Sequence, residues 1–318
     1  MADGRRFLVT GALGAIGVWT MRSLLERGHE VVAFDLGGDT RRMRLALSES
    51  QRAAVTMLKG DITDLAAVER GLDEHEITGV IHLAALQVPF VRADPVHGAR
   101  VNVVGTVNVL EAARRRADRL GPVVYASSIA VYAGGRASLA ADDQPGTLYG
   151  VFKRANEGTA QRYFEDYGLS SIGLRPHTVY GPARDQGLTS APTLAMVAAA
   201  AGRSYHIPFG GSAQFQYTAD VGEAVAQTAL LEYEGASVHD LDGHVAAIAD
   251  VTALIERAAP GASITADEAP LPFPAEVGGA SFVELLGGSV MRPLDEGIAD
   301  AVDRFRRLLA DGLVQPPE

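Results

Sequence analysis

Short apolar stretches alternate with longer amphipathic ones through the first half of the chain. The apolar stretches are rich in β-branched residues and end at glycine, proline or polar turns, which is typical of buried strands. They cover residues 5–10, 30–35, 54–60, 79–85, 122–128 and 170–175, and helical stretches lie between them at 15–28, 63–74, 98–119 and 149–167. Strands that are apolar throughout and alternate with helices predict a parallel sheet covered on both faces. We therefore expect an α/β fold with a Rossmann-type, doubly wound parallel sheet.

The pattern changes after about residue 176, where proline and glycine interrupt the chain and the helical stretches become shorter. This change predicts a Rossmann domain over residues 1–176 and a smaller, mainly substrate-binding region over 177–318. One strong helical stretch, 217–234, interrupts the second region. We expect residues 215–235 to pack back on the first domain.

Composition narrows the possible functions. The chain has 318 residues, 47% of them hydrophobic, with 28 basic and 39 acidic residues and a net charge of −11. Such a charge argues against a nucleic-acid or anionic-membrane surface. The absence of cysteine excludes disulfides and thiolate catalysis and fits a reducing compartment. No apolar run approaches the length of a membrane span, and the N-terminal stretch lacks the sustained apolar core of a signal peptide. We expect a cytoplasmic protein.

A glycine-rich loop, "TGALGAIG", follows the first predicted strand and opens the first helix. Glycines at this junction allow a tight turn and let the backbone approach a pyrophosphate at the positive end of the helix dipole. Asp35 ends the second strand 18 residues after Gly17 and suits the hydroxyls of an adenosine ribose. The pattern predicts NAD, although Arg41 and Arg42 leave a 2′-phosphate, and hence NADP, open. The loop residues expected to contact the cofactor are Gly11, Leu13, Gly14, Ala15, Ile16 and Gly17.

The ends of the next two strands supply further cofactor contacts. Asp61 and Ile62 end the third strand, where they are expected to flank an adenine. Leu83, Ala84 and Ala85 end the fourth strand, and the small side chains leave room for the cofactor. Ligands of such a sheet bind outside the carboxyl ends of its strands, so these residues are expected to lie together.

A tyrosine and a lysine, Tyr149 and Lys153, stand four residues apart on a predicted helix and therefore share one face. An ammonium near a phenol, together with a positively charged nicotinamide, favours the phenolate and lowers its pKa. The phenolate is then a base for an alcohol that loses a hydride to the cofactor. Ser128, at the end of the fifth strand, is placed to hydrogen-bond the reacting oxygen.

Together these motifs resemble the extended short-chain dehydrogenase/reductases, the NAD-dependent epimerase/dehydratase family. The matching segments are TGxxGxxG (10–17), the strand-end Asp35, "GDITD", "HLAA", "NVVGT", "ASSIAVY", YxxxK and "LRPHTVYGP" (174–182). The resemblance implies that Ser128, Tyr149 and Lys153 are catalytic and that Asn102 assists near the cofactor. It implies that Pro176 and the residues after it pass the nicotinamide into the substrate pocket. A homodimer paired through helices 98–119 and 149–167 would also resemble family members.

Departures from the family pattern narrow the range of possible reactions and substrates. Ile129 and Ala130 follow Ser128 where sugar dehydratases carry an Asp-Glu pair, so dehydrogenases and simple 4-epimerases remain. "AQFQYTAD" (213–220) lacks the arginine that grips a diphosphate in nucleotide-sugar epimerases, and 267–288 holds no cation. The candidate polar groups are Gln87, Arg92, Ser128, His177, Thr178, Arg184, Thr189 and Ser190.

We therefore expect an enzyme that transfers hydride at a secondary alcohol of a carbohydrate-like small molecule rather than of a nucleotide sugar. A nucleotide-sugar 4-epimerase is the alternative. A non-catalytic NAD-binding sensor would be expected to lose Tyr149 or Lys153, and both are present. The chemistry needs no metal, and strand alternation in "HDLDGH" (239–244) sends His239 to the opposite face from Asp240.

Overall fold

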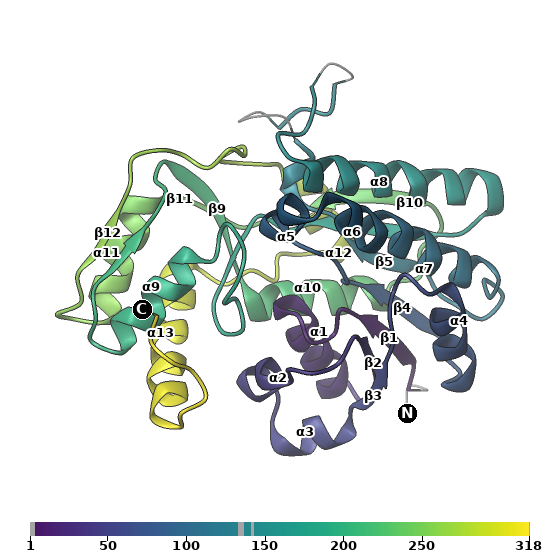
Figure 1. The fold of residues 1–318 in the computed structure, drawn as a ribbon, viewed down its shortest axis with the longest axis horizontal. Coiled ribbons are helices and arrows are strands. Elements are labelled where there is room, and N and C mark those ends of the chain that lie inside the picture. The colour runs from purple at the N-terminus through teal and green to yellow at the C-terminus, as the bar shows by residue number, and fades with distance from the viewer. Residues whose placement is uncertain (1–3, 133–136, 141–142, 318) are drawn as a thin grey trace.

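The structure is a computed structural model that describes residues 4–132, 137–140 and 143–317 (Figure 1). Its centre is a seven-stranded parallel sheet in the order β10-β6-β5-β4-β1-β2-β3. The strands are β1 (Arg6–Thr10), β2 (Glu30–Asp35), β3 (Thr56–Lys59), β4 (Gly79–His82), β5 (Val123–Ala126), β6 (Ser171–Arg175) and β10 (Ala236–Asp240). The six strands predicted in the first half all form, and none of their ends differs from the predicted one by more than three residues. The predicted Rossmann-type fold is confirmed.

Helices cover both faces of the sheet, as the apolar strands required (Figure 1). Side chains alternate between the faces: Phe7 and Val9 enter one buried cluster, and Leu8 enters the other. The first face carries α1 (Ala15–Glu26) and α10 (Thr218–Leu230), and the second carries α4 (Leu65–Glu74), α7 (Gly105–Arg114) and α8 (Leu148–Tyr167). Short helices fill the connections: α2 (Arg41–Ala46), α3 (Glu49–Ala54), α5 (Val88–Ala93) and α6 (Pro95–Ala99).

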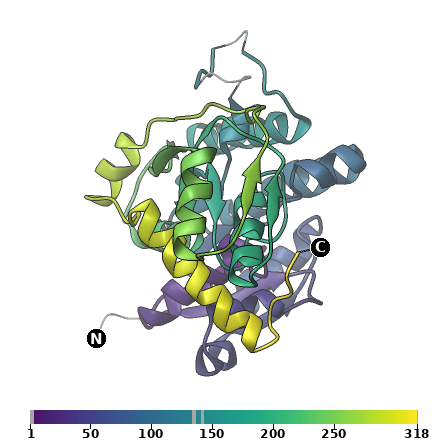
Figure 2. The same ribbon diagram turned by 90° about the vertical axis from the view of Figure 1, so that its left-hand side faces the viewer.

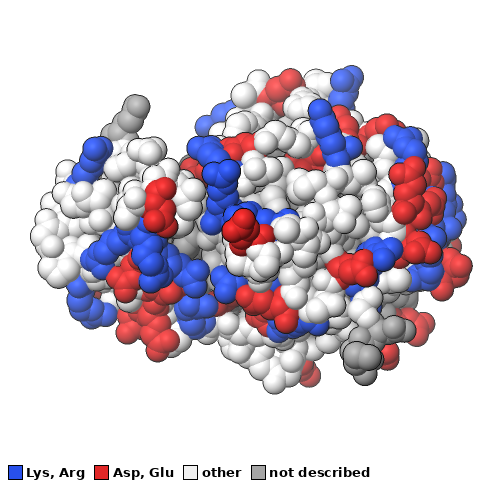
Figure 3. All heavy atoms as spheres, turned by 90° about the horizontal axis from the view of Figure 1, so that it is seen from below, with Lys and Arg blue, Asp and Glu red and all other residues white. Residues whose placement is uncertain are grey.

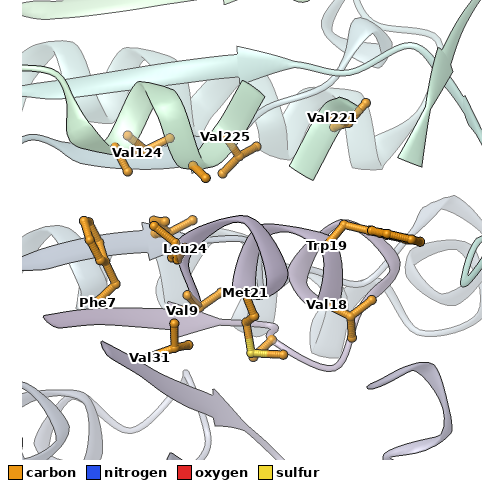
Figure 4. Close-up of a cluster of buried hydrophobic side chains, with 14 of the residues drawn as sticks. Phe7, Val9, Val18, Trp19, Met21, Leu24, Val31, Val124, Val221 and Val225 are labelled. Atoms are coloured by element: carbon orange, nitrogen blue, oxygen red, sulfur yellow. The ribbon is translucent and has the colours of Figure 1, made fainter. Parts of the chain in front are cut away.

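Helix α10 returns from the second half of the chain to pack against α1. Figure 4 shows Val221 and Val225 of α10 above Trp19 and Leu24 of α1. A Cβ on Gly222 would lie 2.5 Å from the Cβ of Trp19, so the small residue permits this close approach. Helix α10 thus shares one buried cluster with α1. The structure also adds β10 to the sheet edge beside β6, although the boundary drawn at residue 176 had left this strand in the second region.

The second region has its own small core beside the sheet. It contains a three-stranded sheet, β11-β9-β7, and a two-stranded sheet, β12-β8, packed with α9, α11 and α13 (Figure 2). The strands are β7 (Thr178–Tyr180), β8 (Tyr205–Ile207), β9 (Ser212–Tyr217), β11 (His244–Ala247) and β12 (Ile264–Ala266). The helices are α9 (Ala191–Ala200), α11 (Ile248–Ala258) and α13 (Leu294–Ala310). Tyr180, Phe215 and Phe305 belong to the core of this region. Helix α12 (Ala280–Leu286) instead contacts β10, and its Phe282 enters the core of the large sheet.

Acidic and basic side chains lie interspersed on the face drawn in Figure 3, and neither sign forms a large separate patch there. In the described part of the chain, no helix combines the length and the apolar character needed to cross a bilayer. Within the same residues, no group of three or more His, Asp or Glu side chains could hold a metal ion.

Candidate active site

A cleft of about 500 Å³ lies at the carboxyl ends of the parallel strands and is closed on one side by the segment that follows β7. Nearly all the residues predicted to contact the cofactor or the substrate line it. They are Gly11, Leu13, Gly14, Ala15, Ile16, Gly17, Asp35, Asp61, Ile62, Leu83, Ala84, Ala85, Gln87, Ser128, Tyr149, Lys153, Pro176, His177, Arg184 and Thr189. The structure thus brings the sequence motifs into one place.

The glycine loop leaves no room for side chains. A Cβ on Gly11, whose φ is +65°, would lie 2.6 Å from the backbone nitrogen of Ala84. A Cβ on Gly17 would lie 2.6 Å from the carbonyl oxygen of Gly11. The N-cap of α1 is Gly14, and no side chain caps the first turn. The N–H groups of this turn therefore remain available to phosphate oxygens, and the loop fits the pyrophosphate of a dinucleotide.

Asp35 lies at the end of β2 with its carboxylate in the cleft, where it accepts a hydrogen bond of 3.0 Å from the Leu13 N–H. This position suits the hydroxyls of an adenosine ribose. Arg41 and Arg42, which could have bound the 2′-phosphate of NADP, both form ion pairs with carboxylates. Arg41 pairs with Asp39 at 2.7 Å, and Arg42 pairs with Asp185 at 2.6 Å. The cofactor pocket accordingly fits NAD.

Ser128, Tyr149 and Lys153 meet at the floor of the cleft. Ser128 follows β5 and caps a 3₁₀ turn (Ile129–Val131). Its hydroxyl is close enough to the phenol of Tyr149 to act on the pKa of that group. Thr147 caps α8 by accepting a 3.1 Å hydrogen bond from Gly150, so Tyr149 and Lys153 stand on the first turns of that helix. The Lys153 ammonium lies 5.7 Å from the centre of the Tyr149 ring and donates to the Ala126 carbonyl at 2.6 Å.

The electrostatics differ from the expectation in one respect. Burial raises the pKa of Tyr149 above its usual value, while the Ser128 hydrogen bond and the charge of Arg184 oppose that rise. In the protein alone, the Lys153 ammonium does not contribute to lowering the pKa of Tyr149. Burial instead lowers the pKa of Lys153 itself to about 8, and the charge of Glu157 opposes that change. A further positive charge in the cleft, such as that of oxidised NAD, would act against burial and lower the pKa of Tyr149.

Lys153 also makes a testable contribution to stability. A buried amine whose pKa falls from 10.5 to about 8 opposes folding while charged. Above pH 10.5 the amine is neutral and this penalty is absent. As the pH falls from 10.5 through about 8, the penalty develops and the free energy of unfolding decreases. Between pH 7 and pH 9.5, the wild type should gain about 2 kcal/mol in unfolding free energy relative to Lys153→Met. Urea unfolding at both pH values measures the difference.

The same substitution at Lys59, an exposed lysine at the end of β3, is the matched control for this experiment. A difference between wild type and Lys153→Met that does not change with pH would contradict the depressed pKa of Lys153.

Four predicted site residues do not line the cleft: Asn102, Thr178, Arg92 and Ser190. The first two lie behind it. Asn102 is buried in a π-helical turn (Arg100–Val104), where its side chain holds the backbone N–H and carbonyl of Leu86 at 2.7 and 2.8 Å. Thr178 is fully buried, and its hydroxyl lies 3.1 Å from Nδ1 of His177. Both residues hold cleft segments in place, because their polar groups are already satisfied by neighbouring protein atoms.

His177 lines the substrate end of the cleft in its neutral form. Burial lowers its pKa to about 4, against its hydrogen bond to Pro274. The Pro274 carbonyl can only accept, so Nε2 donates this 2.7 Å bond and Nδ1 accepts from Thr178. The bond fixes the segment around Phe273, which also lines the cleft.

Arg184 and Gln87 meet at the same end, and each has an unsatisfied polar atom. Nη2 of Arg184 donates to Thr189 at 3.1 Å, but Nε of Arg184 and Oε1 of Gln87 are shielded from solvent and have no partner among the described residues. A Cβ on Gly187 would lie 2.1 Å from Oε1 of Gln87 and 3.0 Å from Nη2 of Arg184. Burial lowers the pKa of Arg184, while Tyr149 and Asp185 oppose that change.

Sequence reasoning missed a buried ionic network beneath this site. Arg175 donates two hydrogen bonds to Glu157, at 2.7 and 2.8 Å, and one to Tyr132 at 2.8 Å. Ser127, next to Ser128, also donates to Glu157. Two signals were available: Glu157 continues the Tyr149–Lys153 face by one further turn, and Arg175 is a lone cation in an apolar strand. No sequence pattern indicated that Phe273 belongs to the site, because only the folded chain brings this residue to the cleft.

Comparison with known proteins agrees with this geometry. Residues 7–238 match the family described as the NAD dependent epimerase/dehydratase family. UDP-glucuronate 4-epimerase 2 of Arabidopsis thaliana is 36% identical over 190 residues, which cover 57% of this chain and 43% of that protein. The match thus spans less than half the length of this curated relative.

Two solved structures resemble nearly the whole chain. The UDP-glucose 4-epimerase of Thermus thermophilus, in complex with NAD, is 28% identical with a TM-score of 0.79, over 95% of this chain and 99% of that one. MoeE5, in complex with UDP-glucuronic acid and NAD, is 27% identical with a TM-score of 0.77, also over 95% and 99%. The predicted family and the NAD cofactor are confirmed. The chain belongs to the NAD-dependent epimerase/dehydratase family.

Proposed function

We propose that this protein is a 4-epimerase that acts on a nucleotide-linked uronic acid of the UDP-glucuronate type. The observation that carries the proposal is the Arg184 guanidinium, which lines the cleft near Tyr149 and whose Nε has no partner among the described residues. A shielded cation with a free donor calls for an anionic acceptor, and a carboxylate is the common one in sugars. The free Oε1 of Gln87 calls for a donor in the same place. A sugar acid offers both groups, a carboxylate and neighbouring hydroxyls.

The residues of the cleft then have distinct tasks. Arg184 and Gln87 hold the sugar by its carboxylate and a hydroxyl, with the C4 hydroxyl at Tyr149. Tyr149 takes the proton of that hydroxyl, and Ser128 hydrogen-bonds the oxygen as charge develops on it. Bound NAD supplies the acceptor and donor of the C4 hydride. Return of the proton from Tyr149 after the sugar has presented its other face gives the epimer.

The relatives favour the nucleotide-linked substrate over the free sugar expected from the sequence. The curated relative and both structures described above are named for, or contain, UDP-sugars. One observation favours a second candidate, a dehydrogenase of a free uronate. Ala213, at the position where the family pattern has a diphosphate-binding arginine, is buried in the second core. The cations that line the cleft within the described residues are Arg42, Lys153 and Arg184.

One experiment separates the two candidates. The purified protein is incubated with UDP-glucuronate, and the appearance of UDP-galacturonate is followed by proton NMR; nucleotide released by heat shows whether NAD stays bound. Free glucuronate and galacturonate are tested separately with added NAD, and NADH absorbance is followed. Epimer formation with retained NAD supports the proposal. NADH formation from a free uronate alone supports the second candidate, and turnover of UDP-glucose in preference to UDP-glucuronate would contradict the role given to Arg184.

We also propose that the protein pairs with a second copy through α7 and α8. Val104, at the end of the π-helical turn that leads into α7, and Val151 and Tyr167 on α8 are large, exposed apolar residues. Burial of such residues in an interface stabilises a dimer. Light scattering on the purified protein should give twice the chain mass. Substitution of Val151 with glutamate should shift this value towards that of a monomer.

A further inference from the structure

Arg42 and Asp185 join two parts of the molecule that lie 143 residues apart in sequence. Arg42 belongs to α2, which follows the cofactor-binding strand β2, and Asp185 follows β7 on the substrate side. Nε and Nη2 of Arg42 both donate to Oδ1 of Asp185, at 2.9 and 2.6 Å. The two halves of the cleft are thus connected by a charge-assisted, two-point contact.

Arg42 is also tied to the glycine loop. Its third nitrogen, Nη1, donates to the Leu13 carbonyl at 3.3 Å, and the Leu13 N–H donates to Asp35 at 3.0 Å. Leu13, Asp35 and Arg42 all line the cleft. The orientation of the loop that fits the pyrophosphate is therefore linked through Arg42 to Asp185.

On the other side, Asp185 directly follows Arg184. The charges of Asp185 and Arg42 both act on the pKa of Arg184, which shows how closely the three groups are gathered. The chain of contacts Leu13–Arg42–Asp185 thus runs across the rim of the cleft to the segment that holds the substrate end.

We propose that Arg42 and Asp185 are positioning residues that hold the substrate segment against the glycine loop and so slow the release of NAD. Asp185 acts only through Arg42, since it does not line the cleft. The pair is partly exposed, with 25% and 43% of the two side chains accessible, so it can open and close without unfolding. This inference depends on NAD as the cofactor and is independent of the proposed substrate.

The test measures release of the cofactor itself. The dissociation rate of NADH is followed by its fluorescence as excess NAD displaces it, and the Kd of NAD is measured by calorimetry. We expect Arg42→Gln and Asp185→Asn each to raise the NADH dissociation rate about two- to fivefold. The double variant should match Arg42→Gln, because that substitution alone already removes the contacts of Arg42 with both Asp185 and Leu13.

Arg41→Gln is the matched control. Arg41 lies on the same helix and pairs with Asp39, but this pair is local and more exposed, at 73% and 55%. Its loss should leave NADH release unchanged.

The Asp185→Asn variant distinguishes the proposal from a direct attraction between Arg42 and the phosphates. Under direct attraction, freeing Arg42 would leave NADH release unchanged or slow it. That result, or additive effects of the two single substitutions, or an equal effect of Arg41→Gln, would overturn the proposal.

Discussion

Replacement of Tyr149 with phenylalanine is expected to lower kcat by about a hundred- to ten-thousandfold, the usual contribution of a general acid–base residue. The substitution removes the oxygen that takes and returns the proton and keeps the ring that lies 5.7 Å from the Lys153 ammonium. NAD binding should persist, because the glycine loop and Asp35 are untouched. The measurement is kcat with UDP-glucuronate, together with the Kd of NAD from calorimetry.

Tyr163→Phe is the matched control on the same helix. The Tyr163 hydroxyl lies 3.4 Å from a Glu111 oxygen on α7, about four turns along α8 from Tyr149. It does not line the cleft. This variant should keep near-normal kcat. Residual activity above a tenth of the wild type in Tyr149→Phe, with NAD still bound, would show that another group moves the proton.

The second large effect is expected at Arg184. Arg184→Met removes the donor assigned to the carboxylate while retaining a similar length of side chain. Hydrogen bonds to charged groups contribute about 1.5–3 kcal/mol, so kcat/KM for UDP-glucuronate should fall about ten- to a hundredfold. For UDP-glucose, which lacks the carboxylate, the fall should be much smaller. The ratio of the two kcat/KM values measures the specificity that Arg184 provides.

Arg92→Met supplies the control for that experiment. Arg92 is an exposed cation on α5 that was a candidate by sequence but does not line the cleft. An equal loss of kcat/KM for both substrates in Arg184→Met would mean that Arg184 supports the structure of the site without recognising the carboxylate.

The sheet and the reacting helix were predictable because their signals are local. Apolar runs such as 30–35 fixed the strands, and the spacing of Tyr149 and Lys153 on α8 required them to share a face. The cofactor loop was equally local, since its glycines, its helix and Asp35 lie within one strand–helix–strand unit. Such features depend on residues that are close in sequence, so they can be predicted without knowledge of the whole fold.

The remaining features depend on contacts between distant segments. Arg42 and Asp185 are 143 residues apart, and no periodicity joins them. Asn102 matched a family pattern, yet its side chain binds the backbone of Leu86, a partner that sequence does not indicate. The raised pKa of Tyr149 was not predicted either. Burial outweighs the effect of a charged neighbour on this pKa, and burial is known only once the cleft is packed.

We propose that Tyr149 removes the proton of a C4 hydroxyl while the C4 hydrogen leaves as hydride and returns within the same site. UDP-glucuronate deuterated at C4 tests this mechanism. In unlabelled water, the product should be UDP-galacturonate that retains deuterium at C4, detected by mass spectrometry and by NMR. Loss of the deuterium to solvent during turnover would contradict it.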